Sequence, residues 1–573
     1  MTIRSAFKDS AGAVSGWNPL TLALLTGVWI AALPNWPLWR ALTALPEMGS
    51  VRGWIFITGF GLMISALTTA LLALAAWRFT IKPAITVLLL MAAIGAHFMG
   101  SYGVVIDPTM MTSVVQTDAR EVFELLSWRL MGSVLVLAGL PLVLIWRVRL
   151  RSVSVGAQAL RNAFGLTAAL LVLGALVMGL FGDLSATMRN HKSIRYMVNP
   201  ANSVYGLVVI GMQSKVGSPG SLVPIGVDAT VIPRSADARP PLLLLVVGET
   251  ARADHFALNG YARPTTTELA ALGVASYRNV TSCGTHTAAS LPCMFSHLGK
   301  AGFEARAADH ENLLDLVQRA GMAVLWLDNQ AGCKGLCDRV PNAFARDAPV
   351  GEPPLPAALC KAGECLDAAL LVGLDARLAS LPAQARERGV LIVLHQMGSH
   401  GPDYYKRSPA DRKPFQPECT SSLLQECERK TLINSYDNSI AYTSHVLAQA
   451  VQWLKRQSPN YDTTMLYLSD HGESLGENNL YLHGLPNSVA PRAQTHVPLV
   501  VWLSAQSQSE SQSRSNVGVT TECLRRQRNT ALSHDNLFHS VLGLLGIQAS
   551  EYRPALDAFA ACRKPLSPVA APT

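Results

Sequence analysis

Residues 241–250, PLLLLVVGET, form a continuous apolar run that ends in a glycine, a glutamate and a threonine. An apolar run of this length without polar alternation is typical of a strand that is buried on both faces of a sheet. Four further runs have the same character: 323–329 (AVLWLDN), 389–401 (GVLIVLHQMGSHG), 463–474 (TTMLYLSDHGES) and 496–504 (HVPLVVWLS). We predict that all five segments are strands of one sheet.

Helical patterns separate these predicted strands. They cover residues 311–321 (ENLLDLVQRAG), 366–381 (LDAALLVGLDARLASL) and 431–457 (TLINSYDNSIAYTSHVLAQAVQWLKRQ). Strands that alternate with helices predict a mostly parallel sheet with helices on both faces. The ligands of such a sheet gather beyond the carboxyl ends of its strands.

Polar residues stand at the ends of three predicted strands. Glu249 ends the first strand, His395 and His400 follow a middle one, and Asp470 and His471 end another. Glu249, Asp470 and His471 together offer oxygen and nitrogen donors, which suit a zinc ion. His395 directly follows an apolar run, so we expect it to be a buried supporting residue.

A fourth donor is available in SCGTHTAASLPCMF, residues 282–295. A cation lowers the pKa of a hydroxyl that it binds, and so converts a poor nucleophile into a competent one. Thr285 and Thr287 are the two candidates, and the metal-ligand pattern alone does not choose between them.

The N-terminal third of the chain is more apolar than the rest. Over the whole sequence 49% of the residues are hydrophobic, 15% are charged and the mean hydropathy is +0.24, which is too apolar for an ordinary soluble protein of several domains. Five nearly charge-free runs explain the excess, each close to the ~20 residues that a bilayer-spanning helix needs. They cover residues 17–39, 54–77, 83–106, 130–146 and 162–182. A buried soluble bundle is the alternative, but five successive runs favour membrane spans, and no cleavage pattern marks the first as a signal peptide.

The basic residues predict how these spans are oriented, because Lys and Arg near span ends stay in the cytoplasm. With the N-terminus inside, the inner segments carry eight basic residues against one acid, and the outer segments carry four against five. Five crossings then place everything after Asp183 outside the cytoplasm.

Most of the net positive charge lies in the N-terminal part. The chain has 47 basic and 39 acidic residues, and 12 of the basic and 6 of the acidic residues precede Asp183. Only +2 of the net charge of +8 therefore belongs to the outer part. We therefore expect no nucleic-acid partner.

All ten cysteines lie after Ser282, in the part that is predicted to be outside the cytoplasm. An even number confined to this part suggests five disulfides in an oxidising compartment. The close neighbours are Cys283 and Cys293, Cys333 and Cys337, Cys360 and Cys365, and Cys419 and Cys427, which leaves Cys523 and Cys562 as a longer-range pair. Sequence spacing does not prove this connectivity. Free thiols or a metal cluster are the alternative, but the spacings match no zinc-ribbon pattern.

Three regions follow from these observations. Residues 1–182 are predicted to form a transmembrane domain with five spans, and residues 241–573 a periplasmic catalytic domain. The connector between them, residues 183–240, contains SATMRNHKSIRYMVNPANSVYGLVV (185–209). This stretch is polar and contains aromatic residues, so we expect it to include an amphipathic helix at the membrane surface.

Five ordered motifs of the outer part carry a resemblance to a known family. They are VVGETARADHFALNGYARPTT (246–266), TSCGTHTAASLPCMFS (281–296), DNQAGCKGLCDR (328–339), HQMGSHGPDYYKR (395–407) and YLSDHGESLGENNLYLHGLP (467–486). The chain resembles the phosphoethanolamine transferases that modify lipid A, which include the mobile colistin-resistance enzymes. The resemblance implies five N-terminal spans and a periplasmic domain of the alkaline-phosphatase/sulfatase fold.

The same resemblance implies that Thr287 is the nucleophile and shares one tightly bound zinc ion with Glu249, Asp470 and His471. The residues support this choice, since Thr287 precedes a predicted helix start, where free backbone N–H groups favour an anion. A Cys283–Cys293 disulfide would hold that turn in place. Thr285 is then a substrate-contacting or supporting hydroxyl, and an ordinary turn threonine is an equal alternative.

The remaining motif residues are candidates for substrate contacts. His400 and His483 match family positions that contact the phosphoryl group, donate a proton or bind a second zinc ion. Lys334, Asn329 and Gln330 are candidate phosphate contacts, although family members often have Asn where this chain has Gln330. In the segment SVVQTDAREVFELL (113–126), Glu121 matches an acidic family position that suits the ethanolamine ammonium, and Ser113 stands where Asn is usual. A loop facing solvent is the alternative. His286 also departs from the small residue that the family often has.

The implied reaction moves phosphoethanolamine from phosphatidylethanolamine to a phosphate of lipid A through a phosphoethanolamine-threonine intermediate. It would lower the negative charge of the outer membrane and the binding of polymyxins such as colistin. We expect a monomer in the bacterial inner membrane with a cytoplasmic N-terminus. The alternatives are a phosphoethanolamine or phosphoglycerol transferase that acts on the lipopolysaccharide core or another periplasmic glycan, and an inactive membrane-anchored binding or sensor protein. A sulfatase is disfavoured because CGTHT (283–287) lacks the Cys-x-Pro-x-Arg pattern.

Overall fold

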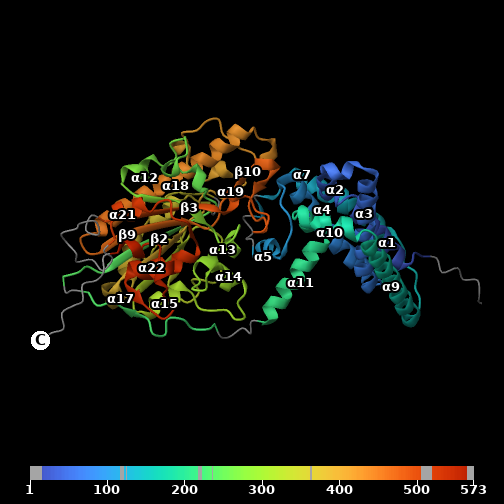
Figure 1. Ribbon diagram of the computed structural model, residues 1–573, viewed down its shortest axis with the longest axis horizontal. Helices are drawn as coiled ribbons and strands as arrows, with labels where there is room; N and C mark the ends of the chain where they lie inside the picture. Colours follow the sequence, from blue (N-terminus) through green and yellow to red (C-terminus); the bar gives the residue numbers. More distant parts are fainter. Residues whose placement is uncertain are drawn as a thin grey trace, which may run out of the picture. The chain divides into compact units, whose positions relative to one another are not determined.

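The computed structural model describes residues 16–116, 122–123, 125–216, 222–234, 237–361, 364–504 and 519–563. The chain forms two compact units. The first is Met1–Met111 with Leu126–Ile210, and the second is Thr112–Leu125 with Gly211–Thr573. The second unit therefore includes a short piece of chain that lies within the N-terminal half of the sequence (Figure 1).

The first unit consists of apolar helices. Four helical stretches are long and apolar enough to cross a membrane: α3 (Val51–Leu74), α4 (Ile81–Tyr102), Trp128–Arg147 and α9 (Val155–Gly179). The third stretch joins α7 (Trp128–Val134) to α8 (Leu140–Arg147) through a π-helical turn, Leu135–Gly139. A fifth is obtained if α1 (Pro19–Ala32) and α2 (Trp36–Thr43) count as one span bent by 44°. Pro34 and Pro37 lie at this bend, where proline removes helix hydrogen bonds.

Two buried asparagines join the bend of the first unit to its connector. The side chain of Asn35 donates to the carbonyl of Asn199 at 2.6 Å, and its oxygen accepts the Asn199 N–H at 2.9 Å. Asn199 in turn donates to the carbonyl of Ala92 on α4 at 2.6 Å. Helices α10 (Phe181–Asn190) and α11 (Ala201–Val216) flank Asn199 in the chain.

The second unit is built on an eight-stranded sheet with the order β13-β3-β12-β9-β2-β8-β4-β5. Five of its seven strand pairings are parallel, and β12 is antiparallel to both of its neighbours. The strands are β2 (Pro241–Gly248), β3 (Ala275–Thr281), β4 (Ala323–Asp328), β5 (Asn342–Phe344), β8 (Val390–His395), β9 (Asp462–Ser469), β12 (His496–Leu503) and β13 (Leu532–Ser533). The mostly parallel sheet predicted from the sequence is confirmed, although β3, β5 and β13 were not predicted.

Helices cover both faces of the sheet, as predicted. Along β2 the side chains of Leu243, Leu245 and Val247 enter one core and those of Leu242, Leu244 and Val246 enter the other. The first core contains α13 (Thr287–Met294), α15 (Leu313–Arg319) and α22 (Asp535–Leu545), and the second contains α12 (Thr267–Ala271), α16 (Leu374–Ser380) and α18 (Arg429–Gln457). Figure 1 shows α18 and α12 on one side of the strands and α22 and α15 on the other.

Shorter elements complete this unit. The helices are α5 (Pro108–Gln116), which the two units share, α14 (Gly299–Glu304), α17 (Ala383–Arg388), α19 (Arg492–Thr495) and α21 (Thr521–Arg526). Three two-stranded pairs are β1 (Thr230–Val231) with β14 (Ile547–Gln548), β6 (Cys360–Lys361) with β7 (Glu364–Cys365), and β10 (Ser474–Leu475) with β11 (Tyr481–Leu482).

The predicted helix over 366–381 is wrong as one element. The structure has a 3₁₀ turn, Asp367–Leu371, and then α16. Gly373 separates them with φ +67°, and a Cβ there would lie 2.5 Å from Pro349. A left-handed residue interrupts a right-handed helix, so the apolar periodicity continues across a break in the backbone.

All ten cysteines are paired in five disulfides: Cys283–Cys293, Cys333–Cys337, Cys360–Cys365, Cys419–Cys427 and Cys523–Cys562. These are the pairs suggested by sequence spacing.

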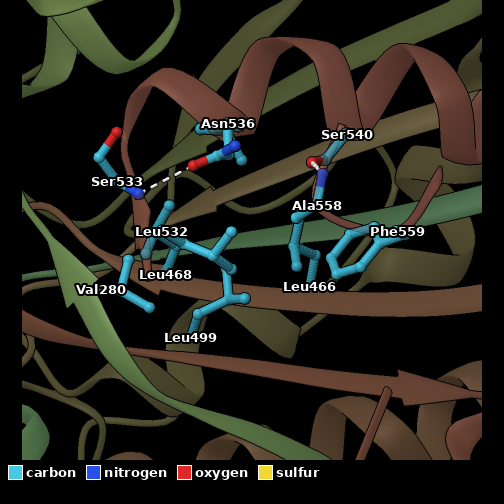
Figure 2. A pocket seen from close by; sticks show the side chains of 11 residues that line it. Val280, Leu466, Leu468, Leu499, Leu532, Ser533, Asn536, Ser540, Ala558 and Phe559 are labelled. Carbon is cyan, nitrogen blue, oxygen red and sulfur yellow. Dashed lines mark hydrogen bonds between the residues drawn. The ribbon is translucent and has the colours of Figure 1, made fainter. Parts of the chain in front are cut away.

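One small apolar cavity of about 10 Å³ lies under α22, between Val280, Leu468, Leu499 and Phe559 (Figure 2). It is at the lower limit of what a single water molecule needs.

Candidate active site

Two neighbouring parallel strands bring the predicted metal ligands together. Gly248, the last residue of β2, is paired with Ser469, the last residue of β9. The next residues along each strand are Glu249 and Asp470, which is followed by His471, and all three are fully buried. We call Glu249, Asp470 and His471 the acid–histidine cluster.

The three side chains of the acid–histidine cluster converge on one point. His471 Nε2 lies 3.2 Å from Glu249 Oε1 and 3.3 Å from Asp470 Oδ2. None of these three atoms has a hydrogen-bond partner among the described residues. His471 Nδ1 donates to the carbonyl of Gly472 at 2.9 Å, so the lone pair of the neutral ring is on Nε2.

Burial makes the acid–histidine cluster unfavourable without a cation. Loss of hydration and then the charge of Glu249 raise the pKa of Asp470 to about 7. Burial also raises the pKa of Glu249 and lowers that of His471. Two carboxylate oxygens and a bare imidazole nitrogen in such surroundings fit a divalent cation, and this donor set suits zinc.

The backbone around Glu249 is held tightly. Thr250 has φ +53°, its N–H donates to Asp470 Oδ1 at 3.3 Å, and its carbonyl accepts the Tyr436 hydroxyl at 2.6 Å. A positive φ at a threonine costs about 1–3 kcal/mol and persists only where the surroundings enforce it. On the other side, Gly398 approaches so closely that a Cβ would lie 2.6 Å from the carbonyl oxygen of Glu249.

Thr287 is the threonine that contacts the acid–histidine cluster. It is the first residue of α13, and its hydroxyl donates to Glu249 Oε2 at 2.9 Å. Thr285 instead donates to the carbonyl of Leu485 at 2.7 Å, and so ties this loop to the segment that follows β11. The Cys283–Cys293 disulfide closes the segment that contains both threonines.

His534 is a site residue that sequence reasoning missed. Its Nδ1 accepts the N–H of Cys283 and its Nε2 donates to the carbonyl of Ser469, each at 3.0 Å. The ring is 1% exposed, and burial lowers its pKa to about 3, so it stays neutral. It links the threonine loop to the end of β9. No sequence signal identifies it, because it follows the two-residue strand β13 far from every motif.

His483 and His400 lie beside the acid–histidine cluster. The β10–β11 pairing brings His483 next to Glu473, with Nδ1 3.2 Å from Oε1. The His483 ring is 4.4 Å from that of His471 and 5.4 Å from that of His400. Burial opposes protonation of His483, but the nearby carboxylates, Glu473 first, outweigh it and raise its pKa to about 9.

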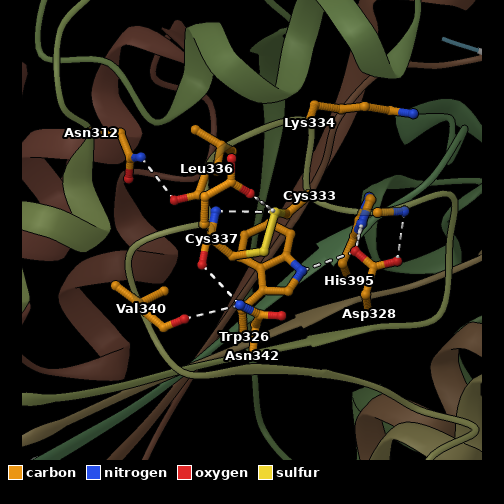
Figure 3. The surroundings of a disulfide bond; sticks show 12 residues. Asn312, Trp326, Asp328, Cys333, Lys334, Leu336, Cys337, Val340, Asn342 and His395 are labelled. Atoms are coloured by element: carbon orange, nitrogen blue, oxygen red, sulfur yellow. Dashed lines mark hydrogen bonds and ion pairs between the residues drawn. A yellow bond between two sulfur atoms is a disulfide. The ribbon is translucent and has the colours of Figure 1, made fainter. Parts of the chain in front are cut away.

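The loop after β4 is organised by Asp328 (Figure 3). Its carboxylate accepts from Trp326 Nε1 and contacts His395 Nδ1, both at 2.9 Å, and accepts the N–H of Gln330 at 2.8 Å. Gln330 Nε2 then donates to Glu249 Oε2 at 3.1 Å. His395 is fully buried and pairs with Asp328, which organises this loop. This agrees with the buried supporting role that we expect for it from the sequence.

Two other predicted residues of this loop donate hydrogen bonds to groups outside the acid–histidine cluster. The amide of Asn329 donates to Asp367 at 2.8 Å and to the carbonyl of Cys365 at 2.9 Å. Lys334 follows Cys333 of the Cys333–Cys337 disulfide, and Figure 3 shows its side chain extending away from that disulfide. Its ammonium donates to the carbonyl of Ala331 at 3.3 Å.

Ser113 contributes to the second unit from α5. Its hydroxyl lies 2.6 Å from His286 Nδ1, and His286 is the residue between the two threonines. Burial, and then the neighbouring His471, His483 and Lys334, lower the pKa of His286 to about 3. Glu121, the other residue predicted in this segment, lies outside the described residues.

Comparisons with known proteins agree with this architecture. Residues 241–547 match the sulfatase family, and residues 64–214 match the family described as phosphoethanolamine transferase EptA/EptB. The chain is 36% identical to phosphoethanolamine transferase EptA of Escherichia coli K12, covering 96% of this chain and 97% of that protein. It is 35% identical to phosphatidylethanolamine transferase Mcr-1 of Escherichia coli, covering 94% and 96%.

A solved full-length structure gives the same result. The integral membrane lipooligosaccharide phosphoethanolamine transferase A of Neisseria meningitidis is 31% identical, with a TM-score of 0.87 and coverage of 95% of this chain and 99% of that one. Matches of this extent cover the apolar helices as well as the sulfatase-type sheet. The chain therefore belongs to the EptA and Mcr-1 family and is a phosphoethanolamine transferase.

Proposed function

We propose that this enzyme transfers phosphoethanolamine from phosphatidylethanolamine to a phosphate of lipid A through a covalent intermediate on Thr287. One observation carries the proposal: the Thr287 hydroxyl contacts Glu249, whose other oxygen meets Asp470 and His471 at a single buried point. The relatives named for phosphatidylethanolamine and for lipooligosaccharide supply the donor and acceptor classes. Both substrates are lipids, so a membrane-anchored enzyme meets them on a surface.

The chain's own residues can carry out both half-reactions. The Thr287 hydroxyl proton already points at Glu249 Oε2, which receives it as the threonine oxygen bonds to phosphorus. The bond from phosphorus to the diacylglycerol oxygen breaks, and His483 or His400 protonates that oxygen. A phosphate oxygen of lipid A then bonds to phosphorus, the bond to Thr287 breaks, and the proton returns from Glu249 to the threonine oxygen. The histidine regains its proton from the lipid A phosphate that attacks or from water.

Glu249, Asp470, His471 and Thr287 would hold one zinc ion. When bound, zinc would lower the pKa of the threonine hydroxyl and offset negative charge on the phosphoryl oxygens. A second zinc ion near His400 and His483 is a further part of the proposal, supported by the proximity of their rings.

The other predicted residues are assigned to substrate. Lys334 and Gln330 would contact phosphoryl oxygens, and Gln330 also orients Glu249. Thr285 and Asn329 fix the loops on either side, while Ser113 and Glu121 belong to the segment proposed to meet the ethanolamine headgroup. These assignments are supported by the motif matches and, for the described residues, by the contacts given above.

We further propose a monomeric protein of the bacterial inner membrane with a cytoplasmic N-terminus, five spans within residues 1–182, a connector at 183–240 and a periplasmic domain at 241–573. The charge bias of the loops supports this orientation. Five disulfides that lie only in the outer domain support the oxidising compartment.

The nucleophile can be identified directly. Purified enzyme incubated with phosphatidylethanolamine should acquire one phosphoethanolamine group, and peptide mass spectrometry should place it on Thr287. Thr287→Ala should remove both the adduct and turnover, Thr287→Ser should retain part of each, and Thr285→Ala should still form the adduct. An adduct on Thr285, or full turnover in Thr287→Ala, contradicts the proposal.

The acceptor needs a separate experiment. Mass spectrometry of lipid A from cells that express the chain should show added phosphoethanolamine on a phosphate, and polymyxin susceptibility should fall in parallel. Cells expressing Thr287→Ala are the matched control. Modification of the core sugars or of another glycan, with unmodified lipid A phosphates, would replace lipid A as the acceptor and leave the enzyme class unchanged.

A further inference from the structure

His286 is a buried residue of the threonine loop that the proposed mechanism does not use. It occupies the position before α13, and its side chain does not cap that helix. It is 4% exposed, and its Nε2 has no hydrogen-bond partner among the described residues. A buried polar atom without a partner is destabilising, so its presence calls for a partner that the protein alone does not supply.

The surroundings of His286 indicate what that partner is. Its next neighbour in the chain is Thr287, whose hydroxyl donates to Glu249, and the positive groups that act on its ring are His483 and Lys334. His286 therefore stands next to the proposed nucleophile, and His483 and Lys334 supply the positive charge that attracts an anionic group. The start of α13, an uncapped helix end, has the same preference for negative charge.

The contact with Ser113 can fix which ring nitrogen carries the proton. When the Ser113 hydroxyl donates to Nδ1, 2.6 Å away, the neutral ring has its proton on Nε2. The opposite tautomer would turn a bare lone pair toward the anionic substrate. An anionic oxygen beside Nε2 therefore selects the tautomer that donates to it.

We propose that His286 is a further substrate-contacting residue, whose Nε2–H donates a hydrogen bond to an oxygen of the phosphodiester during transfer to Thr287. The inference rests on the proposed role of Thr287 as nucleophile. Ser113 is the positioning residue for this donor. Charge on the phosphoryl oxygens increases as the threonine attacks, so the hydrogen bond acts mainly on the chemical step.

The test compares His286→Leu with His286→Gln in the purified full-length enzyme, with vesicles of phosphatidylethanolamine, phosphatidylcholine and lipid A, so that the acceptor discharges Thr287 and turnover is continuous. Leu fills much of the space without a donor, whereas the Gln amide can still donate. The rate of diacylglycerol release should fall ~100-fold in His286→Leu, with kcat affected more than KM, and His286→Gln should recover at least a tenth of the lost rate. Zinc content and thermal stability should stay close to the wild type.

Ser113→Ala provides the second arm and covers the case in which His286→Leu does not fold. Its kcat should fall several-fold, and Ser113→Ala should add almost nothing in a His286→Leu background because both changes remove one interaction. Unchanged kcat in His286→Leu, equal losses in the Leu and Gln variants, or unchanged kcat in Ser113→Ala overturns the inference. A wild-type adduct on Thr287 must be present in all cases. Its absence would refute the proposed function itself, which distinguishes the two failures.

Discussion

Without a bound cation, Asp470 should make the protein less stable as the pH rises from 5 to 8. Burial and then the charge of Glu249 raise the pKa of Asp470 from 3.8 to about 7 in the folded state. In the unfolded chain the same carboxyl ionises near its ordinary pKa. The raised pKa lowers the free energy of unfolding, because the folded protein keeps a proton that the unfolded chain would release. This loss of stability is absent well below pH 3.8, grows by about 1.4 kcal/mol per pH unit and reaches its full size above about pH 7.

The size of the effect follows from these two pKa values. The raised pKa of Asp470 destabilises the metal-free protein by about 2 kcal/mol at pH 5 and by about 4 kcal/mol at pH 8, and the unrounded difference is about 2–3 kcal/mol. A domain of roughly 320 residues has an unfolding entropy of about 0.7 kcal/mol/K, so this difference corresponds to about 4 °C in Tm. Glu249, whose pKa is also raised, acts in the same direction.

Thermal unfolding of the detergent-solubilised full-length enzyme measures this effect. Asp470→Asn is the control, because it keeps the shape of the side chain and cannot ionise. In the presence of a chelator, the Tm of the wild type relative to Asp470→Asn should fall by about 4 °C between pH 5 and pH 8. Adding zinc at pH 8 should raise the Tm of the wild type more than that of the variant. Parallel curves for the two proteins without metal would show that Asp470 keeps an ordinary pKa and would refute the reasoning.

Three other substitutions test the scaffold around the site. An alanine Cβ at Gly472, the residue after His471, would lie 2.0 Å from the carbonyl oxygen of Ala493. Gly472→Ala should therefore lower both zinc content and stability, the latter by about 1–3 kcal/mol. Normal zinc content and Tm would contradict this. His534→Ala leaves the N–H of Cys283 and the carbonyl of Ser469 without partners, and each unpaired group should lower stability by about 1–3 kcal/mol. The variant should also form the adduct more slowly. An unchanged rate would show that His534 does not position the threonine loop. Val280→Ile adds a methylene beside the 10 Å³ cavity and should raise stability by up to about 1 kcal/mol, measured as Tm; a lower Tm would mean that the cavity walls cannot accommodate it.

The strands that carry the proposed metal ligands could be predicted because their signal is local. A strand buried on both faces needs a nearly unbroken apolar run, and β2 and β9 have one. The strand β3 was missed because its segment, ASYRNVT, includes polar residues and two exposed positions. The strands β5 and β13 have three and two residues, which is too short for any periodic pattern.

From residue patterns alone, the site was predictable only where neighbouring strand ends bring residues together, and the predictions of Thr287, Gln330 and His483 came from the family motifs. Glu249 and Asp470 meet because β2 and β9 are adjacent and in register, so one rule about parallel sheets was sufficient. The contact of His534 with Cys283 spans 251 positions, and that of His286 with Ser113 spans 173. Such contacts arise from the packing of separate elements, and no spacing along the chain encodes them.

The position of Thr287 therefore depends on several anchors outside its own helix. α13 has eight residues and contains Pro292, so it is too short to be stable by local hydrogen bonding alone. The Cys283–Cys293 disulfide closes the loop, His534 holds its start against β9, and Thr285 holds it to Leu485. Thr287 is the proposed nucleophile, and such a group must be held within about 0.5 Å of its productive position. Loosening any one anchor should therefore reduce turnover while the protein keeps most of its free energy of unfolding. The acid–histidine cluster itself stays in place on β2 and β9.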